Sequence, residues 1–363
     1  MSTRPSSDER RIAVWLLACC AVLFALIVLG GVTRLTGSGL SITEWRPVTG
    51  VLPPFTEQAW QHEFDLYRAS PEYQKVNRGM SMDQFKVIYG YEYAHRLLAR
   101  ALGLLFAVPL VWFWVRGRIP PRLRWPLVGL LGLGMLQGVL GWFMVASGLV
   151  DMPRVSQYRL AAHLGLALVI FAAMFWLAVR LLRPGAGSSA VPDGTRRGLQ
   201  ALLLLVSVTI VSGAFVAGLR AGMVYNTFPM MGDQWVPSGL LAMEPAWRNW
   251  FENPVTAQFS HRVLALTTFG LVLLLWGWSW RLRLTAMQRA AFHALALMAL
   301  VQVILGISTL LLFVPVSLGA AHQGGAVLLL GATLFALHEL GGTRQRGSAA
   351  VPGAEQLKPM SSG

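Results

Sequence analysis

Two short motifs place ionisable side chains in stretches that are otherwise apolar. The motif YEYAHRLLAR contains Glu92, His95 and Arg96, and the motif QFSHRVLAL contains His261 and Arg262. Imidazole is a common metal ligand, and a carboxylate can exchange protons. Ionisable groups inside a membrane-spanning helix are costly and usually functional. These motifs are therefore the first candidates for a site with chemistry.

The rest of the composition predicts that both motifs lie in a lipid bilayer. Of the 363 residues, 55% are hydrophobic and 13% are charged, whereas soluble domains carry about 25% charged residues. A spanning helix needs about 20 mostly apolar residues, and the uninterrupted apolar runs do not alternate as barrel strands would. We predict an all-α integral membrane protein with eight transmembrane helices. Their predicted ranges are 12–33, 93–115, 125–149, 160–180, 198–219, 259–280, 290–314 and 316–340.

The distribution of charge predicts the orientation of the spans. The net charge of +14 would suit a nucleic-acid partner, but the basic residues are concentrated in alternate connections. The N-terminus, the C-terminus and segments 116–124, 180–197 and 281–289 hold 17 Lys and Arg against four acidic residues, and the intervening loops hold ten of each. The basic set is cytoplasmic by the positive-inside rule. Both termini are therefore expected in the cytoplasm, and no nucleic-acid partner is expected.

The two halves of the chain repeat the same landmarks in the same order. Three pairs of residues match at similar offsets: His95 with His261, Gln137 with Gln302, and His163 with His322. Each half has an even number of spans, which predicts two parallel-repeat four-helix bundles. The expected domains are a cytoplasmic tail at 1–11, an N-terminal half at 12–184 with an outer loop at 34–90, a linker at 185–198, a C-terminal half at 199–341 and a disordered cytoplasmic tail at 342–363.

The four matched histidines form two pairs at similar depth, near the outer ends of their spans. Two imidazoles that face each other on neighbouring helices suit the axial positions of a haem iron, and a four-helix bundle offers an apolar gap for the porphyrin. A bare zinc or copper site would usually need a third or fourth ligand, and neither half offers one. Haem is therefore the favoured interpretation, with hydrogen bonding between helices as the alternative for any one histidine.

The neighbours of these histidines indicate how the halves differ. Arg96 and Arg262 directly follow the first histidine of each pair. A guanidinium at this place could pair with haem propionates, or it could extend to the lipid headgroups. Glu92 lies three residues before its histidine, and Gln258 takes the matching place. A carboxylate can exchange protons and an amide cannot, so we expect chemistry in the N-terminal half and a resident cofactor in the C-terminal half. The alternative for Glu92 is a carboxylate that the dipole favours at a helix N-terminus.

Several longer motifs resemble the haem A synthase family, most of all its proteobacterial and mitochondrial branch. The resemblance rests on GGVTRLTGSGLSITEWRPVTGVLPP (Gly30 to Pro54), YEYAHRLLAR, QGVLGWFMV, the NTFPMM segment (Asn226 to Met231) and the C-terminal HR and HQ motifs. It extends over residues 10–340, which is nearly the whole chain.

The resemblance implies a reaction and a set of site residues. It implies a bacterial inner-membrane enzyme that oxidises the C8 methyl of haem O to a formyl group through a hydroxymethyl intermediate, and so supplies haem A to terminal oxidases. It implies that His261 and His322 hold a resident haem b near the periplasmic side. It also implies that His95 and His163 belong to the substrate-haem site and that Glu92 is required there. A haem O synthase, an electron donor and a second copy of the chain are candidate partners.

One feature departs from the family. Some members carry a cysteine pair in the first outer loop, whereas the only cysteines here, Cys19 and Cys20, lie in the first predicted span and are expected to pack there. A mechanism that needs a thiol pair in the loop is in doubt. We predict that SITEWRPVTGVLPP covers the substrate site, with an ordinary interfacial cap as the alternative. A di-haem electron-transfer cytochrome and a haem transporter are the alternative functions.

Overall fold

All eight predicted spans are helices in the computed structural model, which describes residues 5–46, 49–148, 155–186 and 191–340. Each helix is long and apolar enough to cross a membrane. Their bounds are α1 Ser7–Leu35, α4 Met82–Val115, α5 Pro121–Ala146, α6 Gln157–Leu182, α7 Asp193–Gly218, α9 Pro254–Ser279, α10 Ala286–Leu311 and α11 Val316–Glu339. The prediction of an all-α membrane protein with eight spans is confirmed.

Shorter helices lie in the two long loops, and the described residues contain no β-strand. The first loop, residues 36–81, joins α1 to α4, and the second loop, residues 219–253, joins α7 to α9. Their helices are η1 Thr49–Val51, α2 Glu57–Arg68, α3 Pro71–Lys75, η2 Ala221–Met223, η3 Ala246–Arg248 and α8 Asn249–Glu252.

Helix α4 begins 11 residues earlier than its predicted span. Ser81 caps it by accepting a hydrogen bond from the Gln84 backbone, and the Gln84 side chain accepts one from the Ser81 backbone in return. The added turns carry Phe85 and Tyr89, which pack on the first loop around Tyr67. The hydropathy pattern missed these turns because their apolar face packs on the loop. Glu92 therefore lies well inside α4, and the alternative interpretation of it as a carboxylate at a helix N-terminus is wrong.

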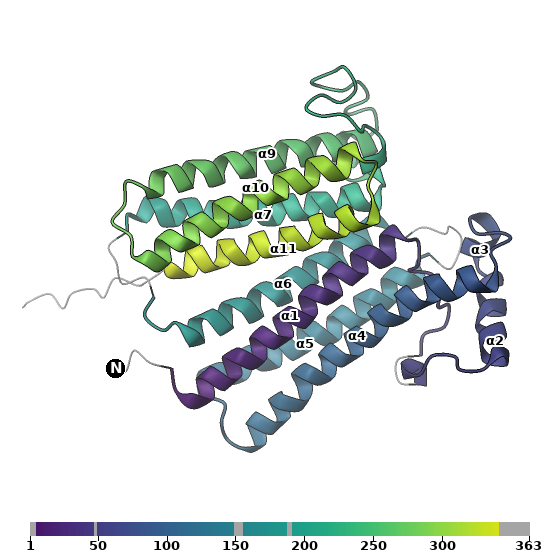
Figure 1. Cartoon of the computed structure of the whole chain (residues 1–363), viewed down its shortest axis with the longest axis horizontal. Coiled ribbons are helices and arrows are strands. Elements are labelled where there is room, and N and C mark those ends of the chain that lie inside the picture. The colour runs from purple at the N-terminus through teal and green to yellow at the C-terminus, as the bar shows by residue number, and fades with distance from the viewer. Residues whose placement is uncertain (1–4, 47–48, 149–154, 187–190, 341–363) are drawn as a thin grey trace, which may run out of the picture.

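The eight long helices form two groups of four that lie side by side (Figure 1). One group contains α1, α4, α5 and α6, and the other contains α7, α9, α10 and α11. The groups meet through contacts of α1 and α6 with α11 and of α7 with α6. Both long loops lie at one end, and α1 begins at the same end as α11 finishes (Figure 1). That the groups are duplicates of one ancestral unit stays a prediction.

Three predicted boundaries fall differently or lie outside the described residues. Helix α1 begins at Ser7, so the predicted tail at 1–11 is partly helical, and α7 begins at Asp193, inside the predicted linker at 185–198. In both places a few polar residues extend an apolar helix beyond its hydrophobic span, which hydropathy alone does not detect. The predicted disordered tail at 342–363 lies outside the described residues.

The interior of the bundle is a continuous apolar core. Leu16 and Leu23 of α1, Phe171 of α6 and Leu330 of α11 are among its buried residues. Cys19 and Cys20 are buried and free, as the interpretation of them as packing residues requires. The four matched histidines lie toward the loop end of each group, outside this core, and each is only partly buried.

Candidate functional site

The structure brings the predicted histidine pairs together across the centre of each helix group. The rings of His261 on α9 and His322 on α11 lie 6.4 Å apart between centroids, with their planes at 88°. His95 on α4 and His163 on α6 are close enough to interact electrostatically. In both cases the two residues belong to helices on a diagonal and not, as predicted, to neighbouring helices.

The diagonal placement follows from the helix contacts. Helix α9 packs on α7 and α10, and α11 packs on the same two helices. In the other group, α4 packs on α1 and α5, and α6 packs on α1 and α5. Each histidine pair therefore spans the middle of four helices. A flat apolar group between two such imidazoles would be surrounded by helix faces on all sides.

Two glutamines hold the second histidine of each pair by its backbone. The side chain of Gln137 on α5 donates to the carbonyl oxygen of His163 at 2.9 Å, and Gln302 on α10 donates to the carbonyl of His322 at 2.8 Å. The glutamines were matched by sequence, and the structure gives them the same contact. This hydrogen bond fixes the helix turn from which each imidazole projects.

Glu92 is buried and accepts hydrogen bonds at both carboxylate oxygens. Oε2 accepts from the Ser41 hydroxyl at 2.7 Å and from the Ile42 backbone N–H at 2.9 Å. Oε1 accepts from Arg96 Nη2 at 2.6 Å and from Arg96 Nε at 3.1 Å. Only 3% of Glu92 is exposed. Four hydrogen bonds therefore hold the Glu92 carboxylate in one place.

The same ion pair ties the first loop to α4. Arg96 also donates to the carbonyl oxygens of Ile42 at 2.9 Å and of Glu44 at 3.2 Å. Glu92 and Arg96 together therefore hold Ser41 to Glu44 beside His95. Part of SITEWRPVTGVLPP thus contacts Glu92 and Arg96, and its role as a cover over the substrate site stays a prediction.

The C-terminal half contains a related arrangement without a carboxylate. Gln258 donates to the carbonyl oxygen of Tyr225 at 3.0 Å, and Arg262 donates to Tyr225 at 3.0 Å, to Thr227 at 2.9 Å and to Met230 at 3.2 Å. Both arginines of the repeated His-Arg motif thus bind loop carbonyls in this structure. Their predicted role beside haem propionates stays a prediction.

Comparison with known proteins identifies the family. Residues 13–334 match the family COX15-CtaA, described as cytochrome oxidase assembly protein. The chain belongs to the COX15-CtaA family. Proteins named heme A synthase from Nitrosospira multiformis, Parvibaculum lavamentivorans and Rhizobium meliloti are 50%, 49% and 48% identical to it. The alignments cover 93%, 93% and 95% of this chain and 98%, 96% and 94% of those proteins.

The side chains of this COX15-CtaA member suit a haem between His261 and His322. The Ser212 hydroxyl donates to the carbonyl of Thr209 at 2.7 Å, and Ser212 Oγ lies 2.8 Å from His261 Nδ1. With the hydroxyl hydrogen committed to Thr209, His261 Nδ1 must carry the hydrogen of this contact. The Nε2 lone pair is then left for a metal, a typical outer-shell arrangement for a ligating histidine.

The second histidine of each pair also has a nitrogen without a protein partner. The Nδ1 atoms of His163 and His322 are buried and find no hydrogen-bond partner among the described residues. A buried polar atom normally has one. Two imidazoles in each half, with unused nitrogens, fit axial ligation of one haem in each half.

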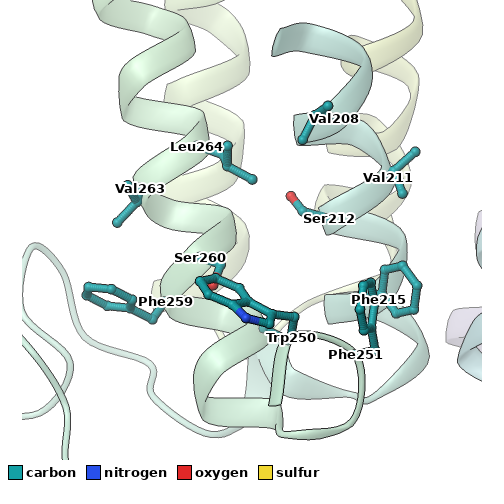
Figure 2. A pocket seen from close by; sticks show the side chains of 11 residues that line it. Val208, Val211, Ser212, Phe215, Trp250, Phe251, Phe259, Ser260, Val263 and Leu264 are labelled. Carbon is teal, nitrogen blue, oxygen red and sulfur yellow. The ribbon is translucent and has the colours of Figure 1, made fainter. Parts of the chain in front are cut away.

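An apolar cavity of about 440 Å³ lies behind the His261 contact, between α7 and α9. Figure 2 shows Ser212 and Leu264 directed into it, with Trp250 across its loop end. The hydroxyl of Ser212 and that of Ser260 are both bonded to helix carbonyls. The cavity therefore offers hydrocarbon contact with almost no free polar group.

A second, smaller cleft of about 160 Å³ lies over α4 beneath the first loop. Tyr89, Tyr93 and Arg96 of α4 line one wall. Arg100 of α4 also lines this cleft and donates to the carbonyl of Arg46 at 3.0 Å.

Sequence reasoning missed the residues that hold the site together. Ser41 and Ile42 lie about 50 residues before Glu92, in a loop with no periodicity to align them. Ser212 lies 49 residues before His261 and looks like any small residue of an apolar helix. No local pattern marks these contacts.

Proposed function

We propose that this protein is a haem A synthase, which oxidises the C8 methyl of haem O to a formyl group through a hydroxymethyl intermediate. The observation that carries the proposal is identity of about 50% over nearly the full length to proteins of that name. The two histidine pairs, each spanning a four-helix group, supply the haem ligands that such an enzyme needs.

The two halves have different roles in this proposal. His261 and His322 hold a resident haem b, which supplies electron transfer when bound. His95 and His163 flank the substrate haem O, whose hydrocarbon tail stays in the lipid. The N-terminal half has Glu92 where the C-terminal half has Gln258. Only the carboxylate of Glu92 can take up and release a proton near the reacting methyl.

The hydrogen bonds of Glu92 define how it works. Conversion of a methyl to a formyl group is a four-electron oxidation in which two C–H bonds are replaced by a C=O bond, so protons are transferred at the reacting group. In this proposal the Glu92 carboxylate, which Ser41, Ile42 and Arg96 hold in place, exchanges a proton with the reacting group. Glu92 also holds Ser41 and Ile42 beside His95, which shields the reacting edge of the substrate from water.

The location follows from the charge pattern. We place the protein in the bacterial inner membrane with both termini in the cytoplasm and both long loops on the periplasmic side. Both haem sites then lie near the periplasmic surface. Haem O synthase and an electron donor are the expected partners, and a homo-oligomer is compatible with the exposed lipid-facing helices.

The test of the site is Glu92→Gln in the full-length protein. The amide still accepts from Ser41 or Ile42 but cannot exchange protons, so the formation of haem A should fall at least tenfold. The spectrum of the resident haem b should remain, because its ligands lie in the other half. Production of haem A at the parental rate by Glu92→Gln would show that the role given to Glu92 is wrong.

Pigment analysis separates the synthase from a di-haem cytochrome and from a transporter. Haems are extracted from membranes that contain the chain beside a source of haem O, and are identified by liquid chromatography with mass detection. Hydroxymethyl and formyl haems should appear only when the chain is present. Unchanged haem O together with bound haem b, under reducing conditions known to support the reaction, would favour the electron-transfer function instead.

A further inference from the structure

Each of the four imidazoles rests against a glycine of an adjacent helix. A Cβ atom built on each glycine would lie about 3 Å from its histidine ring. The contacts are Gly30 with His95 at 3.0 Å, Gly141 with His163 at 3.1 Å, Gly213 with His261 at 3.0 Å and Gly306 with His322 at 2.9 Å. Carbon atoms in good contact are about 3.5–4.0 Å apart, so even alanine would push the ring away.

These glycines make room for a ring and not for a neighbouring helix. At all four, the nearest atoms to the added Cβ belong to the histidine side chain. Gly218 on α7 is different, because its nearest neighbours are the Cα and Cβ of Gln157 on α6. Close approach of helices is the usual use of glycine in membrane bundles, and it explains Gly218 but not the four glycines beside the histidines.

Three of the four glycines lie close in sequence to another residue that holds the same histidine. Gly141 lies one turn after Gln137 on α5, and Gly306 lies one turn after Gln302 on α10. Each helix therefore holds the next histidine at two points, the backbone carbonyl and the ring. Gly213 directly follows Ser212, which binds Nδ1 of the ring that Gly213 supports.

We propose that Gly30, Gly141, Gly213 and Gly306 are positioning residues that set the orientation of the four haem-binding imidazoles. This proposal rests on the proposed function, in which those imidazoles bind haem iron. A glycine inside a helix makes the helix less stable than alanine would, so its presence needs a reason. Here the glycine, which has no side chain, leaves space for the imidazole ring of a histidine. The position of that ring is set by few rotatable bonds, so a methyl group added at the glycine must turn the ring.

The ring of His95 is held differently from the other three. The atom nearest to Gly30 is His95 Nε2, whereas Cε1 is nearest at the other three glycines. No hydrogen bond from the His95 ring is found within the described parts of the chain, whereas His261 is held by Ser212. Substitution of Gly30 therefore acts on a nitrogen of the ring, whereas substitution of the other three glycines acts on the ring carbon Cε1.

The experiment compares alanine variants of the full-length protein with matched controls. Gly138 on α5 and Gly270 on α9 have no neighbour within 4 Å of an added Cβ, so Gly138→Ala and Gly270→Ala are the controls. We expect Gly213→Ala and Gly306→Ala to lower the haem b content of the purified protein at least fivefold, or to shift its low-spin electron paramagnetic resonance signal. The controls should keep the parental content and signal.

The N-terminal variants provide their own folding check. Gly30→Ala and Gly141→Ala should reduce haem A formation at least fivefold while the haem b spectrum of the other half remains parental. Parental haem content, signal and haem A formation in all four variants would overturn the proposal, as would an equal loss in Gly138→Ala. His261→Ala and His322→Ala test the proposed function separately, because retention of haem b by both would refute the ligand assignment itself.

Discussion

At the scale of single residues, Glu72 in α3 is a buried carboxylate outside the candidate site. It accepts a hydrogen bond from the Tyr67 hydroxyl at 3.3 Å, and Asn77 donates to that hydroxyl at 2.7 Å. Burial raises the pKa of Glu72 from 4.5 to about 7, the Tyr67 hydrogen bond lowers it, and nearby Glu92 raises it further. The first loop therefore holds Glu72 most stably in its neutral form.

The sign of this shift predicts how the stability of the first loop depends on pH. The folded protein retains a proton that the unfolded chain releases above pH 4.5. The stability that neutral Glu72 contributes is therefore complete below pH 4.5 and is lost as the pH rises through about 7. The full shift corresponds to about 3 kcal/mol.

Glu72→Gln should remove this dependence. Since the amide is neutral at every pH, the variant should melt at a higher temperature than the parent at pH 8, with the difference shrinking toward pH 5. Thermal unfolding of the purified parent and variant at pH 5 and pH 8 measures the difference in melting temperature. Glu57→Gln, an exposed residue of the same loop, is the control and should change the melting temperature little. An equal melting temperature of parent and Glu72→Gln at pH 8 would contradict the prediction.

At the scale of elements, the second loop is held mainly by Arg262 of α9, with one further hydrogen bond from Gln258. Arg262 binds three carbonyl oxygens between Tyr225 and Met230, and hydrogen bonds from charged groups contribute about 1.5–3 kcal/mol each. Asn226 anchors the same segment to the carbonyl of Leu310 on α10 at 2.7 Å. The segment is therefore held between two helices of the C-terminal half.

Arg262→Ala should loosen this segment without unfolding the helices. Hydrogen–deuterium exchange of residues 225–230 should become at least tenfold faster, while exchange in α9 and α10 stays at the parental rate. Arg283→Ala, an exposed arginine beyond the far end of α9, should leave the loop unchanged. Parental exchange of residues 225–230 in Arg262→Ala would mean that Asn226 and Gln258 suffice to hold the segment.

At the scale of the whole molecule, an ion pair between a partly exposed arginine and a buried glutamate joins the two helix groups at the end opposite the long loops. Arg183, which follows α6, donates through Nε to Glu339 Oε1 at 2.5 Å and through Nη2 to Oε2 at 3.0 Å. The Glu339 side chain is 3% exposed. Gln288 of α10 donates to the Glu339 backbone carbonyl at 2.9 Å, so this residue links α6, α10 and α11.

Arg183→Ala should destabilise the protein because it leaves a buried carboxylate without its main cation. The expected cost is about 1–3 kcal/mol, because solvent screens the partly exposed arginine, and it should be seen as a lower melting temperature in detergent. The double variant Arg183→Ala with Glu339→Gln should recover much of the loss, since the amide carries no charge. If the double variant is no more stable than Arg183→Ala, packing of the arginine and not its charge explains the contact.

Much of this architecture was predictable from local sequence. Each span follows from the high cost of polar groups in lipid, which is a property of about 20 consecutive residues. The histidine pairs and the exchange of Glu92 for Gln258 followed from the repeated order of the motifs. The spans are marked by residues that are neighbours in the sequence. The histidine pairs and the Glu92–Gln258 difference are marked by short motifs that occur twice.

The tertiary structure alone decided which residues surround the candidate site. Diagonal placement of the histidines depends on which helices pack together, and apolar helix faces look alike in sequence. The donors to Glu92 come from Ser41 and Ile42 in a loop whose path follows no periodicity. The glycine behind each imidazole has a role only because another helix brings a ring to it. Contacts between distant segments are set by the packing of the whole chain, and they determine how the site is held.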